Sequence, residues 1–258
     1  MPVTISLPLR FIKKNCMKKL IAVFLLLSTL GTQGWSQKTI KDANAQQRNL
    51  KNFKAIRVSH GIDLYLTQGN EEAVAVSASE TSFRDKIITE VVDGVLKIYY
   101  EKENGGWSWS DGWRNRKLKA YVSVKTLEKL QASGGSDVFC EGTINAETLS
   151  IGISGGSDLK GQFSCTEIKL SASGGSDATL SGKTDRIKID ASGGSDVNAY
   201  QLSSDYCNIQ SSGGSDVNIT VNKSIIANAS GGSDVYYKGS PTETKTSKSG
   251  SSDIKKVN

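Results

Sequence analysis

Seven aspartates recur along the second half of the chain at intervals of 18 to 21 residues, a spacing that could gather carboxylates into one row. If successive repeats stack as β-strands, neighbouring carboxylates lie about 4.8 Å apart. Such a row could hold Ca²⁺, which prefers oxygen ligands, or each aspartate could cap its own tight turn. Turn capping is favoured, because calcium-binding β-rolls use a much shorter, nonapeptide repeat. The candidate cation ligands are Asp137, Asp158, Asp177, Asp196, Asp216 and Asp234, and Asp253 closes the series.

A second candidate site is the Gly/Ser-rich stretch 104–113, which holds Trp107, Trp109 and Trp113. A loop of this composition is expected to face solvent. Clustered tryptophans in an exposed loop favour recognition, because flat rings bury large areas and carry N–H donors. The partner could be a glycan, stacked on the rings, or an envelope protein. The alternative is that the loop folds back and plugs one end of the molecule.

Other reactive side chains are few. The single histidine, His60, lies on an apolar stripe and is expected to be buried, neutral and hydrogen-bonded at a corner. Cys140, Cys165 and Cys207 are 25 and 42 residues apart, which matches no metal-binding pattern. We expect these cysteines to act as small buried hydrophobes, with one disulfide as the alternative. No catalytic set and no required cofactor emerge.

The elements that position these residues follow from an internal repeat. The motif Ser-Gly-Gly-Ser-Asp occurs six times and a degenerate Ser-Gly-Ser-Ser-Asp once, and these seven copies hold 13 of the 26 glycines. A fixed period near 20 residues is typical of a solenoid. Paired glycines suit a sharp corner that needs positive φ or close backbone approach. The expected corner glycines are Gly134, Gly135, Gly155, Gly156, Gly174, Gly175, Gly193, Gly194, Gly213, Gly214, Gly231 and Gly232.

Apolar residues alternate with polar ones on both sides of each motif, as in Leu149, Ile151 and Ile153 before Gly155. Alternation with period two predicts strands rather than helices. Stacked coils would give each backbone amide a partner in the next coil. The sequence therefore predicts an all-β fold, a parallel β-solenoid with about 19–20 residues per coil in two or three short strands.

The upstream block 50–130 lacks the motif but keeps the alternation, and we interpret it as first coils or a capping β-subdomain. Ser59-His60-Gly61-Ile62-Asp63 resembles a worn corner, and 73–78 and 117–124 are expected strands. Asp93-Gly94 between two β-rich runs predicts a hairpin. The repeat solenoid itself is expected to span 131–258.

The start of the chain indicates export. From Met17, a basic start, an apolar run of about eleven residues and a small-residue end predict a secretory signal peptide, cleaved near 36/37. The run is shorter than the 20 or so residues of a membrane span, so no span is expected after cleavage. Residues 1–36 hold five basic and no acidic residues, leaving 27 basic and 26 acidic ones, a net of +1. This near-neutral chain gives no reason to expect nucleic-acid binding. Residues 37–49 are expected to be a short linker.

The pattern around Phe53, Ile56 and Val58, the run from Leu64 to Gly69, the Asp-Gly hairpin and the serial corners resemble the GIN head domain of putative auto-transporter adhesins. The resemblance covers about 50–258. It implies a β-helix, for which the commoner right-handed coil is expected, and an exported bacterial protein. The family offers no catalytic residues to transfer.

These observations lead to three hypotheses of function. The first is an exported, non-enzymatic, adhesin-like solenoid that binds a glycan or protein partner in the periplasm, at the cell surface or outside the cell. The second is a structural envelope protein without a ligand. The third is a polysaccharide-cleaving β-helix enzyme, which would need a non-repeating cluster of acidic and basic residues in a groove.

Overall fold

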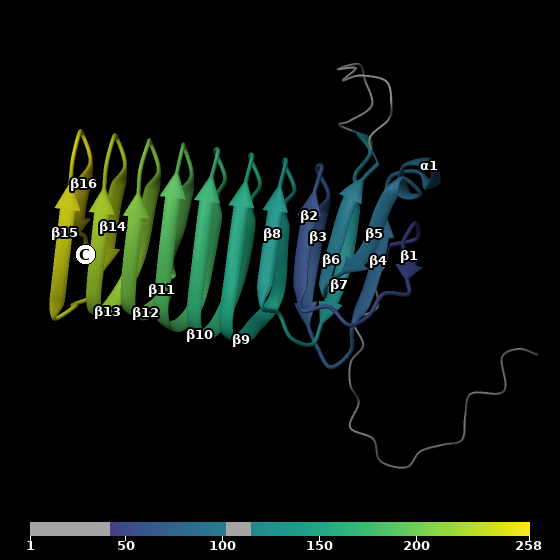
Figure 1. The fold of residues 1–258 in the computed structure, drawn as a ribbon, viewed down its shortest axis with the longest axis horizontal. Helices are drawn as coiled ribbons and strands as arrows, with labels where there is room; N and C mark the ends of the chain where they lie inside the picture. The colour runs from purple at the N-terminus through teal and green to yellow at the C-terminus, as the bar shows by residue number, and fades with distance from the viewer. Residues whose placement is uncertain (1–41, 102–114) are drawn as a thin grey trace, which may run out of the picture. The chain divides into compact units, whose positions relative to one another are not determined.

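The computed structural model describes residues 42–101 and 115–258, which form β-strands wound into coils that stack along one axis (Figure 1). The predicted leader and the tryptophan stretch therefore lie outside the described residues. Five long strands wind the middle of the stack, and each pairs in parallel with its neighbours. They are β9 (Val138–Ser154), β10 (Leu159–Ser173), β11 (Ala178–Ser192), β12 (Asp196–Ser211) and β13 (Asp216–Ala229). The predicted all-β parallel solenoid is confirmed.

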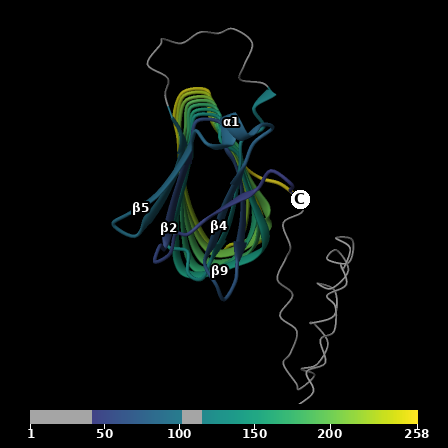
Figure 2. The same ribbon diagram turned by 90° about the vertical axis from the view of Figure 1, so that its right-hand side faces the viewer.

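The coils differ from the prediction in one respect. Each middle coil is one continuous strand of 14 to 17 residues rather than two or three short ones. The strand bends without losing its hydrogen bonds, because the neighbouring coils bend with it and the ladder stays in register. The register between neighbouring strands shifts at a few positions, such as between Lys160 and Gln162 of β10, and these shifts accommodate the bend of the strand. Figure 2 shows the superposed coils end-on.

The C-terminal end of the stack is built from three shorter strands. They are β14 (Asp234–Lys238), β15 (Glu243–Lys248) and β16 (Asp253–Lys256). β14 and β15 both pair with β13, and β16 pairs with β14, all in parallel. Every residue of β15 is exposed.

The order of the coils at the other end differs from their order in the chain. One coil consists of β2 (Ala55–Ser59) and β3 (Asp63–Gln68), joined by the worn corner at 59–63. It lies between the coil of β8 (Lys129–Ser133) with β9 and the coil of β6 (Val95–Tyr100) with β7 (Lys119–Val124). The corner prediction for 59–63 is confirmed, since Ile62 N–H donates to Ser136 Oγ at 3.1 Å, as Ser136 N–H does to Ser157 Oγ.

A reversed coil closes this end. β4 (Ala73–Ser77) pairs antiparallel with β7, β5 (Ile87–Val92) pairs antiparallel with β6, and the short helix α1 (Thr81–Arg84) joins β4 to β5. Positive φ at Asp93 (52°) and Gly94 (73°) forms the predicted hairpin turn. Within the predicted linker 37–49, Gln46–Arg48 form the strand β1, which pairs antiparallel with β4.

The two serines of each motif have different roles, which the motif alone does not reveal. The second serine is buried in every copy, and six of the seven are 0% exposed. In the third and later copies its hydroxyl donates to the carbonyl of the first serine, as Ser195 does to Ser192 at 3.0 Å. In the first four copies it accepts an N–H from the preceding coil, as Ser195 does from Ser176 at 3.4 Å. In the last two copies it instead donates to a carbonyl of the preceding coil, as Ser233 does to Ser211 at 3.0 Å. These hydrogen bonds of the buried hydroxyls tie one corner to the next.

The predicted corner glycines do not all share one geometry. The first glycine of each pair has positive φ throughout, whereas the second has it only in the first three copies, the last being Gly175. The hydrogen-bond direction also reverses. Gly135 N–H donates forward to Gly155 O, but Gly214 N–H donates back to Gly193 O. The corner thus changes its peptide orientation between the third and fifth copies, although the motif is the same.

The interior is filled by inward-facing apolar side chains. Stacked rows of them run from coil to coil, such as Val138, Leu159, Ala178 and Val197. All three described cysteines are free thiols, and Cys165 and Cys207 belong to the core, as predicted, while Cys140 is half-buried. Burial raises the pKa of the Cys140 thiol to about 12 and raises the pKa of Cys207 as well. These thiols are therefore packing groups rather than nucleophiles.

Candidate binding surfaces

The tryptophans Trp107, Trp109 and Trp113 lie outside the described residues, so their role stays a prediction. Their place in the chain is nevertheless informative. The segment that carries them joins β6 to β7, and these strands pair with β2 and β3 respectively. In the β2–β3 coil, the same connection is the corner at 59–63. The tryptophan segment therefore stands in the chain where the neighbouring coil has a short corner.

The seven aspartates line up as predicted. The last four pair with one another from coil to coil, as Asp216 does with Asp234, and the first three directly precede paired residues such as Val138 and Leu159. Asp63 extends the row at the worn corner. The carboxylates accept hydrogen bonds from neighbouring main-chain N–H groups, for example Asp137 Oδ1 from Asp158 N–H at 3.2 Å. Within the described ranges, no group of three or more His, Cys, Asp or Glu side chains is placed to hold a metal ion. These hydrogen bonds run between coils and tie one corner to the next, whereas capping by each aspartate of its own turn stays a prediction.

Crowding of like charges in this row has a measurable consequence. Partial burial, followed by the charges of Asp137 and Asp177, raises the pKa of Asp158. Because the folded protein binds this proton more tightly than the unfolded chain, the carboxylate costs stability at neutral pH and the cost disappears as the pH falls toward 3.8. We expect Asp158→Asn to stabilise the protein at pH 7 by about 0.5 kcal/mol, since solvent screens this exposed group. The advantage over the parent should vanish near pH 4 in urea titrations.

Asp253 provides a control of opposite sign. Hydrogen bonds from Lys255 and Lys248 lower the pKa of this carboxyl group. Asp253→Asn should therefore destabilise the protein at pH 7, and the loss should shrink at acidic pH. A destabilising Asp158→Asn, or the same sign for both variants, would contradict this account of the row.

His60 occupies the place of a corner glycine. Gly61 N–H donates to Gly134 O at 3.0 Å, which aligns His60 with Gly134, and His60 has φ of 66°. Its ring lies 3.3 Å from Ser59 Oγ through Nδ1 and edge-on to Tyr99. The side chain is half-buried rather than fully buried as predicted, because the corner turns it toward the outer surface.

A row of stacked aromatic rings is a feature that sequence inspection missed. Tyr121, Tyr65 and Phe139 lie side by side on the outer face of β7, β3 and β9. The Tyr65 ring lies 5.3 Å from that of Tyr121 and 5.4 Å from that of Phe139, with angles of 23° and 25° between planes. Phe139 is 36% exposed. Three separate chain segments thus build one aromatic surface, which we call the aromatic row.

The aromatic row is bordered by polar residues, and a hydrogen bond holds the Tyr121 ring at one end of it. In the next three coils, the position equivalent to Phe139 holds Lys160, Thr179 and Asn198. The Tyr121 hydroxyl donates to Asp42 Oδ2 at 2.9 Å, and burial together with this bond raises the pKa of Tyr121. Exposed aromatic clusters with a polar border are typical of recognition surfaces. β7, which carries Tyr121, is the strand that follows the tryptophan segment in the chain.

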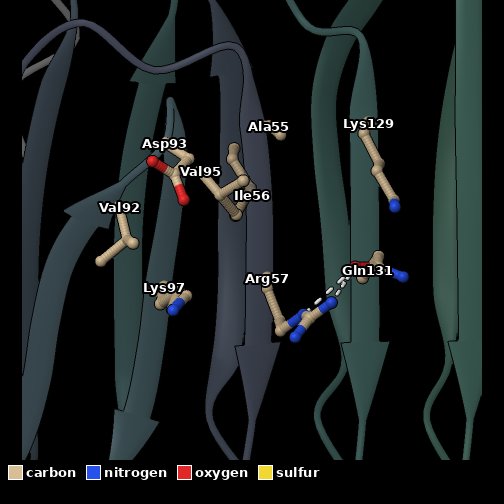
Figure 3. A pocket seen from close by; sticks show the side chains of 9 residues that line it. All are labelled: Ala55, Ile56, Arg57, Val92, Asp93, Val95, Lys97, Lys129 and Gln131. Atoms are coloured by element: carbon tan, nitrogen blue, oxygen red, sulfur yellow. Dashed lines mark hydrogen bonds between the residues drawn. The ribbon is translucent and has the colours of Figure 1, made fainter.

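Two shallow hollows lie on the other face of the coils. One, of about 150 Å³, is lined by residues of β2, β5, β6, β8 and the β5–β6 turn (Figure 3). The other, of about 220 Å³, is lined by serine, alanine, asparagine and glutamine residues of β12, β13 and β15 with their adjacent corners. Neither is a deep cleft of the kind that encloses a small substrate.

The comparison with known families decides the identity of this fold. A family model described as the putative auto-transporter adhesin, head GIN domain, matches residues 52–241. The chain belongs to the GIN head-domain family. The resemblance seen in the corners and the hairpin is thereby confirmed.

Solved structures agree with this assignment. A putative adhesin from Bacteroides fragilis superposes on this GIN domain with a TM-score of 0.74 and 22% identity, over 83% of this chain and 96% of that one. A protein from Parabacteroides distasonis, called a putative lipid binding protein, gives 0.64 and 20%, over 84% and 98%. A putative adhesin from Parabacteroides merdae gives 0.62 and 14%, over 83% and 96%. At these identities the likeness establishes the fold.

Two further findings complete the comparison. No functionally curated protein matches the GIN domain. Among its described residues, no helix is long and apolar enough to cross a membrane. The family and the structural neighbours are named as adhesins or lipid-binding proteins and not as enzymes.

Proposed function

We propose that this GIN domain is an exported, non-enzymatic binding module of the cell envelope, with a glycan or an envelope protein as its partner. The observation that carries the proposal is the aromatic row of Tyr121, Tyr65 and Phe139. An exposed row of aromatic rings lowers the solubility of a protein unless a binding partner covers the rings for part of the time. Tyr121 lies on β7, the strand that follows the segment of Trp107, Trp109 and Trp113 in the chain, which supports a single recognition region.

The packing of the interior favours surface recognition over enclosure of a ligand. Inward-facing positions are occupied by side chains such as Leu64, Val138 and Phe163, all 0% exposed. A lipid chain would need an apolar cavity, whereas the two hollows described above are shallow and open on the outer surface. We therefore infer that the partner lies against the outside of the coils.

An enzymatic role has less support. Cleavage of a polysaccharide requires an acid and a base at a defined separation beside a groove. The repeated aspartates differ little from coil to coil and are engaged by main-chain N–H groups, as Asp216 is by Asp234 at 3.2 Å. This uniformity suits turn structure. A structural envelope protein without a ligand is the remaining alternative, and it leaves the exposed aromatic row unexplained.

The proposal is tested by measuring the binding of purified protein to an array of bacterial and host glycans and to envelope protein fractions. We expect saturable binding to one class, reduced at least about tenfold in two variants, Trp107→Ala/Trp109→Ala/Trp113→Ala and Tyr65→Thr/Phe139→Ser. Tyr206→Ser is the matched control, because Tyr206 is an exposed tyrosine (43%) on a distant coil. Absence of binding, or binding that both variants retain, would overturn the proposal. A defect in envelope integrity on deletion, without binding, would favour the structural alternative.

A further inference from the structure

The hollow of about 150 Å³ combines three chemical features that no single structural role explains (Figure 3). Its basic side chains are Arg57, Lys97 and Lys129, its one carboxylate is Asp93, and Val92 and Val95 form an apolar part. Three positive charges and one negative charge leave it at +2. The whole site lies on described residues and is separate from the aromatic row.

The three cations differ from other basic residues on this face of the coils. Lys54, Lys169 and Lys188 each have a carboxylate nearby, at 2.9 Å from Glu128, 3.5 Å from Glu167 and 2.9 Å from Asp190. Arg57, Lys97 and Lys129 have no carboxylate within 4.0 Å in the described ranges. Asp93 lines the hollow but forms no ion pair with them. None of the three cations is therefore neutralised by a direct ion pair with a described residue, although Glu90 lies opposite Lys97 in the antiparallel ladder of β5 and β6.

Two of these cations are placed directly beside each other. Arg57 of β2 and Lys97 of β6 are paired residues in the parallel ladder. Like charges directly opposite one another across strands are destabilising. The Arg57 guanidinium is oriented by Gln131, whose Oε1 accepts from Nε at 3.1 Å and from Nη2 at 2.8 Å. An oriented guanidinium next to a second cation is an arrangement that suits a carboxylate or another anion.

The remaining lining restricts the class of anion. Val92 is 36% exposed, so an apolar surface borders the basic side of the hollow. Asp93 would repel a compact polyanion such as phosphate, but it can accept hydrogen bonds from hydroxyl groups. A ligand that uses every part needs one negative charge, several hydroxyls and an apolar face. A sugar acid has these three properties.

We propose that this hollow binds a hexuronate unit of an acidic polysaccharide. The carboxylate lies against Arg57 and Lys97, one ring face packs on Val92 and Val95, and ring hydroxyls donate to Asp93. The shallow shape suits one unit of a longer chain, held weakly and reinforced by other contacts. This inference rests on the proposed glycan-binding function and names its ligand class and a second contact region.

The experiment is calorimetric titration of the purified protein at low ionic strength with trigalacturonate and with a glucuronate-containing tetrasaccharide. A neutral galactose trisaccharide and inorganic phosphate are titrated in parallel. We expect at least one acidic oligosaccharide to bind at least about tenfold more tightly than the neutral sugar and phosphate. Arg57→Gln/Lys97→Gln should weaken that binding at least about tenfold. Lys97→Gln alone should leave the thermal midpoint nearly unchanged, because it removes both the repulsion from Arg57 and the attraction to Glu90.

Lys169→Gln/Lys188→Gln is the matched control, since it removes the same amount of charge from the same face, and its binding should stay within about twofold. If both double variants lost the same amount of binding affinity, the binding would depend only on the overall positive charge of this face. That result would overturn the inference. Phosphate binding as tight as that of the acidic sugars, or no binding of either sugar, would also overturn it. If binding of a glycan requires the aromatic residues but not Arg57 and Lys97, the hexuronate site in the hollow would be refuted. The proposed glycan-binding function would then still stand.

Discussion

Gly213→Ala is expected to destabilise the protein by about 3 kcal/mol, whereas Gly214→Ala beside it should have almost no effect. Gly213 has φ of 79°, and a Cβ there would lie 2.8 Å from Gly193 O and 3.1 Å from Gly193 N. The left-handed conformation alone costs about 1–2 kcal/mol with a side chain. The clash adds to this cost, because Gly193 O already accepts from Gly214 N–H at 2.7 Å and cannot move away without loss.

Gly214 is the internal control in the same motif. It lacks positive φ, and the nearest atom to an added Cβ is Gly193 O at 3.8 Å. Alanine there reduces the entropy of the unfolded chain, which offsets small costs in the folded state. Urea midpoints of both variants test the difference. Equal loss in the two variants would mean that the motif needs glycine for a reason other than this close approach.

Phe163→Ala should cost about 3–5 kcal/mol, the range for removing a fully buried aromatic side chain. Phe163 is 0% exposed, and its ring occupies the space beside Gly161, where a Cβ would come within 2.8 Å of it. Its backbone pairs with Ile144 on one side and Gly182 on the other. Because both neighbouring coils hold the strand in register, the structure cannot collapse into the vacated space.

Phe139→Ala is the control of the same chemical type. Phe139 is 36% exposed and its ring stacks on that of Tyr65 at the surface, so loss of the side chain should cost about 1 kcal/mol or less. Thermal and urea unfolding compare the variants, and hydrogen exchange locates the loss. A long repeat array can unfold in parts, so exchange in β9–β11 should rise most in Phe163→Ala. Similar losses for both phenylalanines would contradict the filled interior.

Much of the candidate site could not be read from the sequence. Tyr65, Tyr121 and Phe139 occupy outward positions of three separate strands, and only the register of β7, β3 and β9 makes them neighbours. The basic hollow has the same origin, since Arg57 and Lys97 are 40 residues apart in the chain and adjacent across β2 and β6. A two-residue alternation says which face a side chain takes but not which strand lies next to it.

The parallel solenoid, its period, the worn corner at 59–63 and the Asp-Gly hairpin could all be predicted from the sequence. Those features are local, because side-chain alternation and glycine corners are properties of short segments. Tertiary structure alone decided the place of the β2–β3 coil between later segments, the reversed coil of β4, α1 and β5, and the burial of Ser195 and its equivalents. Each of these depends on hydrogen bonds between coils, and the pairing of distant strands carries no signature within either strand.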